Sequence, residues 1–353
     1  MSSAMHYVAP RWLPGGQLQT IWPALCSRRV FGHAPRYVRQ RWDTPDGDFI
    51  DVDFLERAPA ADGAALARPL LVVFHGLEGS SRSHYSEAFA NLADEQGWAC
   101  ALPHFRGCSG EINRAPRAYH SGDHAEIGWI LAQLRSTCPG VPMMAVGVSL
   151  GGNALLRWAA EVGHDAERLV DAIAGVCAPI DLAAGGYAIG RGFNRQVYNR
   201  MFMRTLVPKA LQKLAQHPGL FDRQALLSAR DLHAFDNVFT APLHGFQNTE
   251  DYWRRASAKP LLGAIRVPTL VVNPLNDPFV PARSLPVQRD VGSYVTLWQP
   301  AHGGHVGFAS GRLPGHVRAM PDAVAGWLAA RAGVRVVATA KSPHGRYRQE
   351  SAG

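Results

Sequence analysis

The stretch from Met143 to Leu156 constrains the fold of this chain more than any other. It opens with an apolar run that predicts a strand and closes with a run that predicts a helix. Between them, Gly147 to Gly151 fit the pattern G-x-S-x-G, which places Ser149 on a sharp turn with its hydroxyl exposed at the top of an α/β sheet. Glycine is needed on both sides because side chains there would collide with the strained turn. The rest of the chain must then supply a base, an acid and hydrogen-bond donors for a nucleophilic serine.

Apolar runs and helical patterns alternate along most of the chain, which predicts an α/β fold. Continuous apolar runs are typical of parallel strands buried on both faces, and their alternation with helices favours a mostly parallel, doubly wound sheet. The predicted strands lie at 69–74, 98–103, 143–147, 170–176, 267–273 and 294–298, and the predicted helices at 86–96, 123–134, 150–162 and 317–331. Two strands at 36–43 and 48–55 precede them, joined by a hairpin turn at Pro45-Asp46-Gly47.

This alternation stops near the middle of the chain. Residues 181–263 show no strand pattern and are rich in bulky aromatic groups, so we expect a helical cap inserted into an α/β core made of 41–180 and 264–332. Residues 1–40 look irregular but carry Pro, Gly and Trp, which predicts an ordered arm packed on the core. Residues 333–353 are basic and polar, which predicts a flexible tail, and an exposed loop is expected at 57–67.

The composition argues against several other classes of protein. The net charge of +8 comes largely from dispersed arginine, without a basic stripe interleaved with aromatic residues, so we predict no nucleic-acid partner. The five cysteines lack C-x-x-C pairs, which favours reduced thiols and a cytoplasmic location. We see no signal-peptide pattern and no apolar run of about 18 residues, so we expect no stable membrane insertion. Peripheral contact with anionic lipid and the oligomeric state stay open.

A serine nucleophile needs a base within hydrogen-bond reach and an acid that orients the base. On a G-x-S-x-G turn, the acid and then the histidine follow the serine along the chain. Asp277 comes just after the predicted strand 267–273, and His305 follows the predicted strand 294–298. Because ligands bind at the carboxyl ends of parallel strands, we predict that Ser149, Asp277 and His305 meet at that edge of the sheet.

Two of these candidates have competitors. Asp181 follows the preceding strand and is the alternative acid, and His302 lies in the same loop as His305. We favour His305 because it follows two glycines in a loop flexible enough to approach the serine, whereas His302 would hold the loop or stay solvated. The two histidines could instead bind a metal, but no third ligand cluster accompanies them. We therefore predict neither a metal nor a cofactor.

Two backbone N–H groups must stabilise the negative charge that develops on the attacked carbonyl oxygen. One is predicted at Leu150, directly after the serine, and the other at Leu77, in the loop after the first parallel strand. His75, in the same loop, is expected to be structural. Arg106 follows a neighbouring strand, where it either contacts substrate or forms a buried ion pair with Glu111 or another acid.

Several short motifs resemble the α/β-hydrolase superfamily, and more closely its YheT-like subfamily. They are Trp12-Leu13-Pro14-Gly15-Gly16, His75-Gly76-Leu77-Glu78-Gly79-Ser80, Phe105-Arg106-Gly107-Cys108-Ser109-Gly110-Glu111, Tyr119-His120-Ser121-Gly122, Gly147-Val148-Ser149-Leu150-Gly151-Gly152-Asn153-Ala154, Thr240-Ala241-Pro242-Leu243-His244-Gly245-Phe246, Asn276-Asp277-Pro278-Phe279 and His302-Gly303-Gly304-His305-Val306-Gly307-Phe308. The resemblance runs from about residue 9 to 330. It implies an α/β-hydrolase fold, a triad of Ser149, Asp277 and His305, and hydrolysis of carboxylic esters. One departure is Gln17, where relatives usually carry histidine.

We therefore expect a serine hydrolase that cleaves carboxylic esters, with a small-molecule ester of short to medium acyl chain as its substrate. The aromatic residues of 181–263 would line an apolar acyl pocket or simply form the core of the cap. The resemblance extends to lipid-acting hydrolases and acyl-CoA:ethanol acyltransferases, so acyl transfer from a thioester to an alcohol is an alternative. A catalytically silent binding module is a second alternative, because a fold does not fix a function.

Overall fold

The computed structural model describes residues 5–56 and 68–337, and its centre is an eight-stranded sheet. The strands are β1 (Tyr37–Asp43), β2 (Phe49–Leu55), β3 (Leu70–Phe74), β4 (Ala99–Pro103), β5 (Met143–Val148), β6 (Ala172–Val176), β7 (Thr269–Val272) and β8 (Val295–Trp298). Their order across the sheet is β1-β2-β4-β3-β5-β6-β7-β8. The strands from β4 to β8 pair in parallel, and the β1–β2 hairpin joins this array antiparallel through β2 and β4. The predicted mostly parallel, doubly wound sheet is confirmed.

Helices cover both faces of the sheet, as the buried apolar strands require. On one face, α3 (His124–Thr137) and α4 (Leu150–Val162) pack over the sheet and contribute to one apolar core. On the other face, α2 (His84–Gln96) and α12 (Ala319–Arg331) pack over a second core. Every residue of β3, β5, β6 and β7 is buried between these layers. Short 3₁₀ turns complete the core at Gly163–Arg168, Lys259–Ala264, Ala282–Ser284 and Gln288–Asp290.

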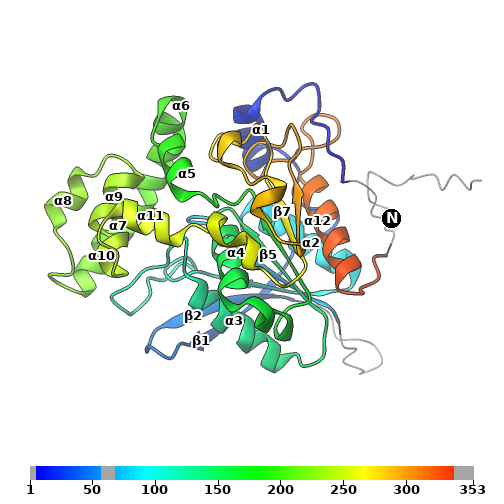
Figure 1. The fold of residues 1–353 in the computed structure, drawn as a ribbon, viewed down its shortest axis with the longest axis horizontal. Coiled ribbons are helices and arrows are strands. Elements are labelled where there is room, and N and C mark those ends of the chain that lie inside the picture. The colour runs from blue at the N-terminus through cyan, green and yellow to red at the C-terminus, as the bar shows by residue number, and fades with distance from the viewer. Residues whose placement is uncertain (1–4, 57–67, 338–353) are drawn as a thin grey trace, which may run out of the picture.

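The segment between β6 and β7 forms the helical cap. Its helices are α5 (Leu182–Ile189), α6 (Gly192–Asn194), α7 (Arg200–Gln216), α8 (Arg223–Ser228), α9 (Leu232–Val238), α10 (Thr240–Leu243) and α11 (Thr249–Ala256), and a π-helical turn at Arg195–Asn199 joins α6 to α7. Residues 181–263 are all described and contain no strand, as predicted. Figure 1 shows the cap helices gathered at one side of the core that contains the sheet. Among the described residues, no helix is both long and apolar enough to cross a membrane.

The prediction that residues 1–40 are irregular is wrong. They contain the helix α1 (Gly16–Leu25), whereas β1, which begins at Tyr37, matches the strand predicted at 36–43. Pro23 within α1 and the glycines at its start hide the helical pattern, and no side chain caps its first turn. The helix is held instead by tertiary contacts with the loop that contains Asn276. The approach is so close that a Cβ at Gly16 would lie 1.9 Å from the Asn276 carbonyl oxygen. The expected loop at 57–67 and most of the expected tail lie outside the described residues.

The close approach of α4 to the sheet gives a stability prediction. A Cβ at Gly151 would lie 2.5 Å from the His75 carbonyl oxygen and 2.8 Å from that of Phe74, both of which are backbone atoms that cannot rotate away. We therefore expect Gly151→Ala to lower the free energy of unfolding by about 2–3 kcal/mol. The control is Gly326→Ala in α12, where the new methyl meets nothing within 4 Å and should add about 0.5–1 kcal/mol. Urea unfolding of both variants measures this difference, and equal stabilities would contradict it.

Candidate active site

Ser149 occupies a strained turn between β5 and α4. Its backbone has φ 53° and ψ −119°, a region that non-glycine residues rarely adopt. The turn closes because Gly147 and Gly151 carry no side chains: a Cβ at Gly147 would lie 2.3 Å from the Gly151 carbonyl oxygen. The Ser149 N–H donates to the Val176 carbonyl oxygen at 2.8 Å, which anchors the turn to β6. The serine therefore projects from the sheet at the start of α4, where helix N–H groups favour negative charge.

Ser149, His305 and Asp277 form one continuous hydrogen-bonded chain. The distance between His305 Nε2 and Ser149 Oγ is 2.9 Å, and the distance between His305 Nδ1 and Asp277 Oδ2 is also 2.9 Å. Asp277 Oδ1 accepts the backbone N–H groups of Phe279 and Val280, which fix the carboxylate. A carboxylate beside Nδ1 keeps the proton on that nitrogen and leaves the lone pair of Nε2 free for the serine hydroxyl. The structure thus brings together all three side chains predicted to act together.

The loop after β3 packs directly against Ser149. A Cβ at Gly76 would lie 3.1 Å from Ser149 Cβ. The N–H of Gly76 donates to the Tyr85 hydroxyl and that of Glu78 to the Tyr119 hydroxyl, whereas the N–H groups of Leu77 and Leu150 donate to no described residue. The two unpaired N–H groups are those predicted to bind an oxyanion.

Neither Asp181 nor His302, the competing candidates, belongs to the hydrogen-bonded chain. Asp181 is the N-cap of α5 and accepts the N–H of Ala184, so it does not approach His305 as the acid. His302 is exposed on the surface and lies outside the hydrogen-bonded chain. His75 is buried, and burial lowers the pKa of its imidazole to about 3. It is therefore neutral, with Nδ1 against the Gly76 carbonyl oxygen and Nε2 accepting the Phe105 N–H, and it joins the loops that follow β3 and β4.

Arg106 does not pair with Glu111, so that part of the prediction is wrong. Its guanidinium contacts Asp46 and Asp48 at 2.8 Å and Glu126 at 2.5 Å. Glu111 instead pairs with Arg41 on β1. Arg106 therefore forms the predicted buried ion pair with acids other than Glu111. Such compensation is expected, since a buried arginine is stable only when its charge is paired. These ion pairs join the β1–β2 turn to α3, and Arg106 is also among the residues that line the cavity containing Ser149.

Sequence comparison assigns the chain to a family. Residues 69–311 match the family model described as alpha/beta hydrolase fold. The chain belongs to the α/β-hydrolase fold family. It is 40% identical over 314 residues to the Escherichia coli (strain K12) protein named "Putative esterase YheT", covering 88% of this chain and 89% of that protein. It is 28% identical over 285 residues to "Phospholipase ABHD3" of Mus musculus, covering 79% of this chain and 68% of that protein.

A solved structure shares the fold of this α/β hydrolase. Est1E from Butyrivibrio proteoclasticus superposes with a TM-score of 0.51 at 15% identity, covering 85% of this chain and all of that chain. At this low identity the likeness concerns the fold alone.

The N-terminal arm supplies residues to the site of this α/β hydrolase that sequence reasoning missed. Buried Gln19 on α1 accepts through Oε1 the N–H of Gly303 at 3.0 Å and the side-chain amide of Asn276 at 2.9 Å. The hydroxyl of Thr20 accepts the N–H of His305 at 2.8 Å. One helix turn therefore holds both the loop that carries the acid and the loop that carries the histidine. The only sequence signal for this role of Gln19 and Thr20 is that they closely follow Gly15-Gly16 of the arm motif.

Gln17, the departure from the usual motif, joins the arm to the cap. Its side-chain amide donates to Asn194 at 2.8 Å and its carbonyl oxygen accepts the Tyr198 hydroxyl at 2.7 Å. Glutamine at this position therefore fixes α1 against α6 and the π-helical turn of the cap, and its side chain forms no hydrogen bond with Ser149, Asp277 or His305.

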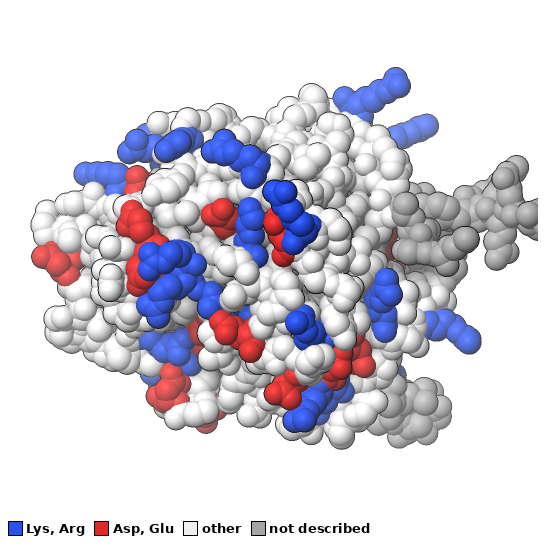
Figure 2. Space-filling model, viewed as in Figure 1, with Lys and Arg blue, Asp and Glu red and all other residues white. Residues whose placement is uncertain are grey.

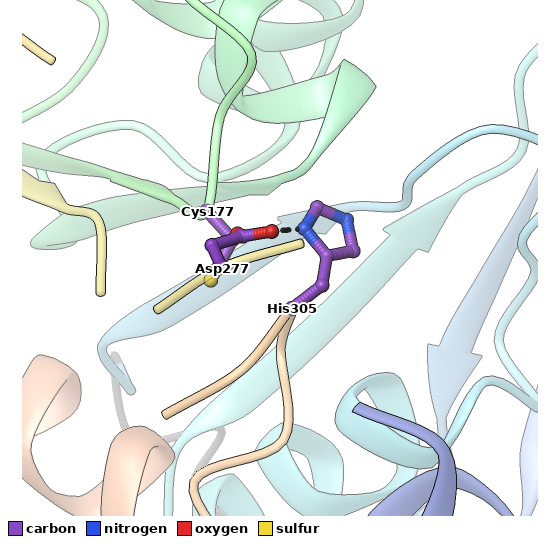
Figure 3. A group of neighbouring side chains, drawn as sticks. All are labelled: Cys177, Asp277 and His305. Carbon is purple, nitrogen blue, oxygen red and sulfur yellow. Dashed lines mark hydrogen bonds and ion pairs between the residues drawn. The ribbon is translucent and has the colours of Figure 1, made fainter. Parts of the chain in front are cut away.

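Cys177 lies beside Asp277 and His305, and the three could in principle form a metal site (Figure 3). Their candidate ligand atoms lie within 4.8 Å of one another. Burial, with the charge of Asp277, raises the pKa of the Cys177 thiol well above its usual value, and the candidate ligand atoms already serve other contacts. The sulfur also accepts the Val306 N–H, and Asp277 is bound to His305. We therefore assign no metal-dependent step to these residues.

A cavity between the core and the cap opens onto Ser149 and His305. Its empty space, including the opening to solvent, is about 1120 Å³. The cap side is mainly apolar, with Ile189, Phe202, Leu206, Phe235 and Phe239 among its lining residues. A polar part of the wall contains Glu78 of the loop after β3, whose carboxylate contacts Lys209 of α7 at 2.8 Å.

The arm contact to the histidine loop gives a matched pair of variants. Thr20→Val removes the oxygen that accepts the His305 N–H but keeps the shape of the side chain, so it should cost about 1–3 kcal/mol of stability through the unpaired buried group. We also expect a fall in kcat of about tenfold, because a loop displaced by a fraction of an ångström misplaces the imidazole. Thr20→Ser retains the hydroxyl and should stay close to wild type in both urea unfolding and kcat. Loss in Thr20→Ser with a wild-type Thr20→Val would show that the methyl group, and not the hydrogen bond, matters.

Proposed function

We propose that this chain is a serine esterase that hydrolyses carboxylic esters through an acyl-enzyme on Ser149. The observation that carries the proposal is the hydrogen-bonded chain from Ser149 Oγ through His305 to Asp277, with 2.9 Å at each junction. Two unpaired N–H groups and an apolar cavity adjoin this chain. The names of the relatives, an esterase and a phospholipase, support an ester as the substrate.

In the acylation half-reaction, Ser149 Oγ attacks the ester carbonyl carbon while His305 Nε2 takes the hydroxyl proton. The carbonyl oxygen becomes an alkoxide, which the N–H groups of Leu77 and Leu150 stabilise. Asp277 stays ionised and stabilises the imidazolium through Nδ1. The C–O bond to the alcohol then breaks, and the proton on Nε2 passes to the departing alkoxide oxygen. The products of this half-reaction are an alcohol and an ester of Ser149.

Deacylation repeats these steps with water as the nucleophile. His305 Nε2 removes a proton from water as the water oxygen attacks the acyl carbon. The same two N–H groups hold the second alkoxide, and its collapse breaks the bond to Ser149 Oγ. The proton on His305 returns to the serine oxygen, so a carboxylic acid leaves and the resting state is restored.

The cavity supports an apolar acyl group as the substrate feature that the cap recognises. Ile189, Phe202, Leu206, Phe235 and Phe239 surround space that extends from Ser149 into the cap. Apolar walls around a few placed polar groups are typical of small-molecule sites. We infer acyl chains of short to medium length, held between α5, α7 and α9 while the ester carbonyl sits at Leu77 and Leu150.

A series of p-nitrophenyl esters from acetate to palmitate tests this proposal. We expect wild type to hydrolyse them with an optimum at short to medium chains, and Ser149→Ala to lose at least about 10⁴-fold in kcat/KM because the nucleophile is gone. Ser136→Ala, an exposed serine on α3, is the matched control and should retain full activity.

Other outcomes identify the alternatives. Hydrolysis that survives Ser149→Ala would assign the activity to another nucleophile. Ester formation from an acyl thioester and ethanol that outpaces hydrolysis would show acyl transfer as the main reaction. Absence of hydrolysis together with failure of a fluorophosphonate probe to label Ser149 would favour a silent binding module.

A further inference from the structure

The outer side of the cap exposes apolar and basic side chains together. The apolar members are Tyr187, Phe193, Val197 and Met201, with 43%, 53%, 37% and 50% of their surface exposed. The basic members are Arg191, Arg195, Arg200 and Arg204, all exposed. We call these eight residues the cap face. Single exposed apolar side chains are normal, but four within fifteen residues, one on α5 and three from α6 to α7, form a patch of the kind that marks an interaction surface.

Five residues of the cap face, Phe193, Val197, Arg200, Met201 and Arg204, follow one side of the nearly continuous helix from α6 to α7. Phe193, Val197 and Met201 are four residues apart along α6, the π-helical turn and the start of α7, so they lie above one another on adjoining turns. The opposite side of the same segment faces the protein, where Phe202 and Leu206 line the cavity that contains Ser149. One helix therefore separates solvent from the cavity, with apolar side chains on both sides.

The charge of this segment has one sign. Residues 182–221 contain four arginines and two lysines but no acidic residue. None of the four arginines of the cap face forms a hydrogen bond or an ion pair through its side chain with any residue in the described ranges, although Arg191 lies over the Tyr187 ring at 5.7 Å. By contrast, Arg39, Arg106 and Arg318 are bound to carboxylates. Figure 2 shows blue side chains along the edge of the molecule over α5 and α6.

The nearest acidic residues along the chain do not neutralise this charge. Asp181, Asp222 and Asp231 are N-caps, and each accepts a backbone N–H group of its own helix, at Ala184, Ala225 and Ala234. These three carboxylates therefore cap α5, α8 and α9, and none of them pairs with an arginine of the cap face. The four guanidinium groups of the cap face, which have no hydrogen-bond or ion-pair partner among the described residues, are therefore available to anions from outside the chain.

We propose that the cap face docks on an anionic phospholipid bilayer. Apolar side chains beside unpaired arginines are the features of a helix that lies in a membrane interface, where the apolar groups enter the acyl boundary and the arginines bind phosphates. A planar guanidinium binds two phosphate oxygens at once, which suits lipid headgroups. This docking would place the cavity next to lipid, so that, on the proposed esterase function, lipid esters could enter it directly from the bilayer.

The experiment measures binding of the full chain to sedimenting vesicles. The protein carries Ser149→Ala so that turnover cannot alter the lipid, and the vesicles are phosphatidylcholine alone or a 7:3 mixture with phosphatidylglycerol. We expect binding to the mixed vesicles at least about tenfold tighter than to phosphatidylcholine, with a marked loss in 0.5 M salt as the charges are screened. Phe193→Ser with Met201→Ser should weaken binding about tenfold, because two anchors leave the interface.

Matched arginine variants test the location of the site. Arg200→Ala with Arg204→Ala, which removes the two arginines beside Phe193, Val197 and Met201, should weaken binding to the mixed vesicles about 30-fold. Arg168→Ala with Arg331→Ala changes the net charge equally but alters exposed arginines outside the cap face, and should weaken binding less than threefold. Equal loss in the two pairs, or equal binding to both vesicle types, would overturn the proposal. In the enzyme that keeps Ser149, Phe193→Ser with Met201→Ser should leave the hydrolysis of a soluble butyrate ester unchanged.

The remaining outcomes keep this proposal separate from the proposed function. A dimer in lipid-free solution that dissociates in Phe193→Ser with Met201→Ser would show that a second copy covers the cap face, and would overturn docking on lipid. Hydrolysis of no soluble ester would overturn the esterase function alone, because vesicle binding is measured without catalysis. Normal ester hydrolysis without vesicle binding would overturn the docking proposal alone.

Discussion

The contact between the backbones of β5 and α4 at Gly147 and Gly151 is the constraint on which the rest of the site depends. Side chains at these positions would overlap carbonyl groups, so only glycine lets α4 begin directly behind the strand and forces Ser149 into its left-handed backbone. That strain is offset by the buried strands on both sides and by the anchoring of the Ser149 N–H on β6. The nucleophile is thus positioned by backbone geometry alone, before any side chain contacts it.

Similar strain occurs around Ser149 in loops that leave the parallel strands. The described non-glycine residues with positive φ are Glu78, Ser149, Cys177, Val306 and Phe308, and each follows the carboxyl end of β3, β5, β6 or β8. Strained loops persist only when surrounding contacts determine them. Here α1 provides many of those contacts, since its Gln19 and Thr20 hold the loops of Asp277 and His305. An arm at the N-terminus therefore stabilises residues more than 250 positions away.

The sequence predicted the sheet and the meeting of Ser149, Asp277 and His305 because both follow from local patterns. Apolar runs mark the strands, and in a parallel sheet the residues that follow each strand must share one edge. The contacts of α1 and of Arg106 could not be found in this way. Gln19 bonds to two loops remote in sequence, and Arg106 takes its partners from the β1–β2 turn and α3 rather than from nearby Glu111. Such pairings depend on how the elements pack, and no periodicity records them.

The cap illustrates why aromatic content alone does not reveal a pocket. Its aromatic residues have three different environments: Phe235 and Phe239 line the cavity, Tyr198 is buried against Phe279, and Phe193 faces solvent. An aromatic letter in the sequence does not distinguish these environments, because they depend on how each helix packs in the folded chain. Because α7 has the cavity on one side and solvent on the other, a displacement of α7 that widens the cavity also moves Arg200, Met201 and Arg204 of the cap face. The outer surface and the cavity that contains Ser149 therefore share one structural element.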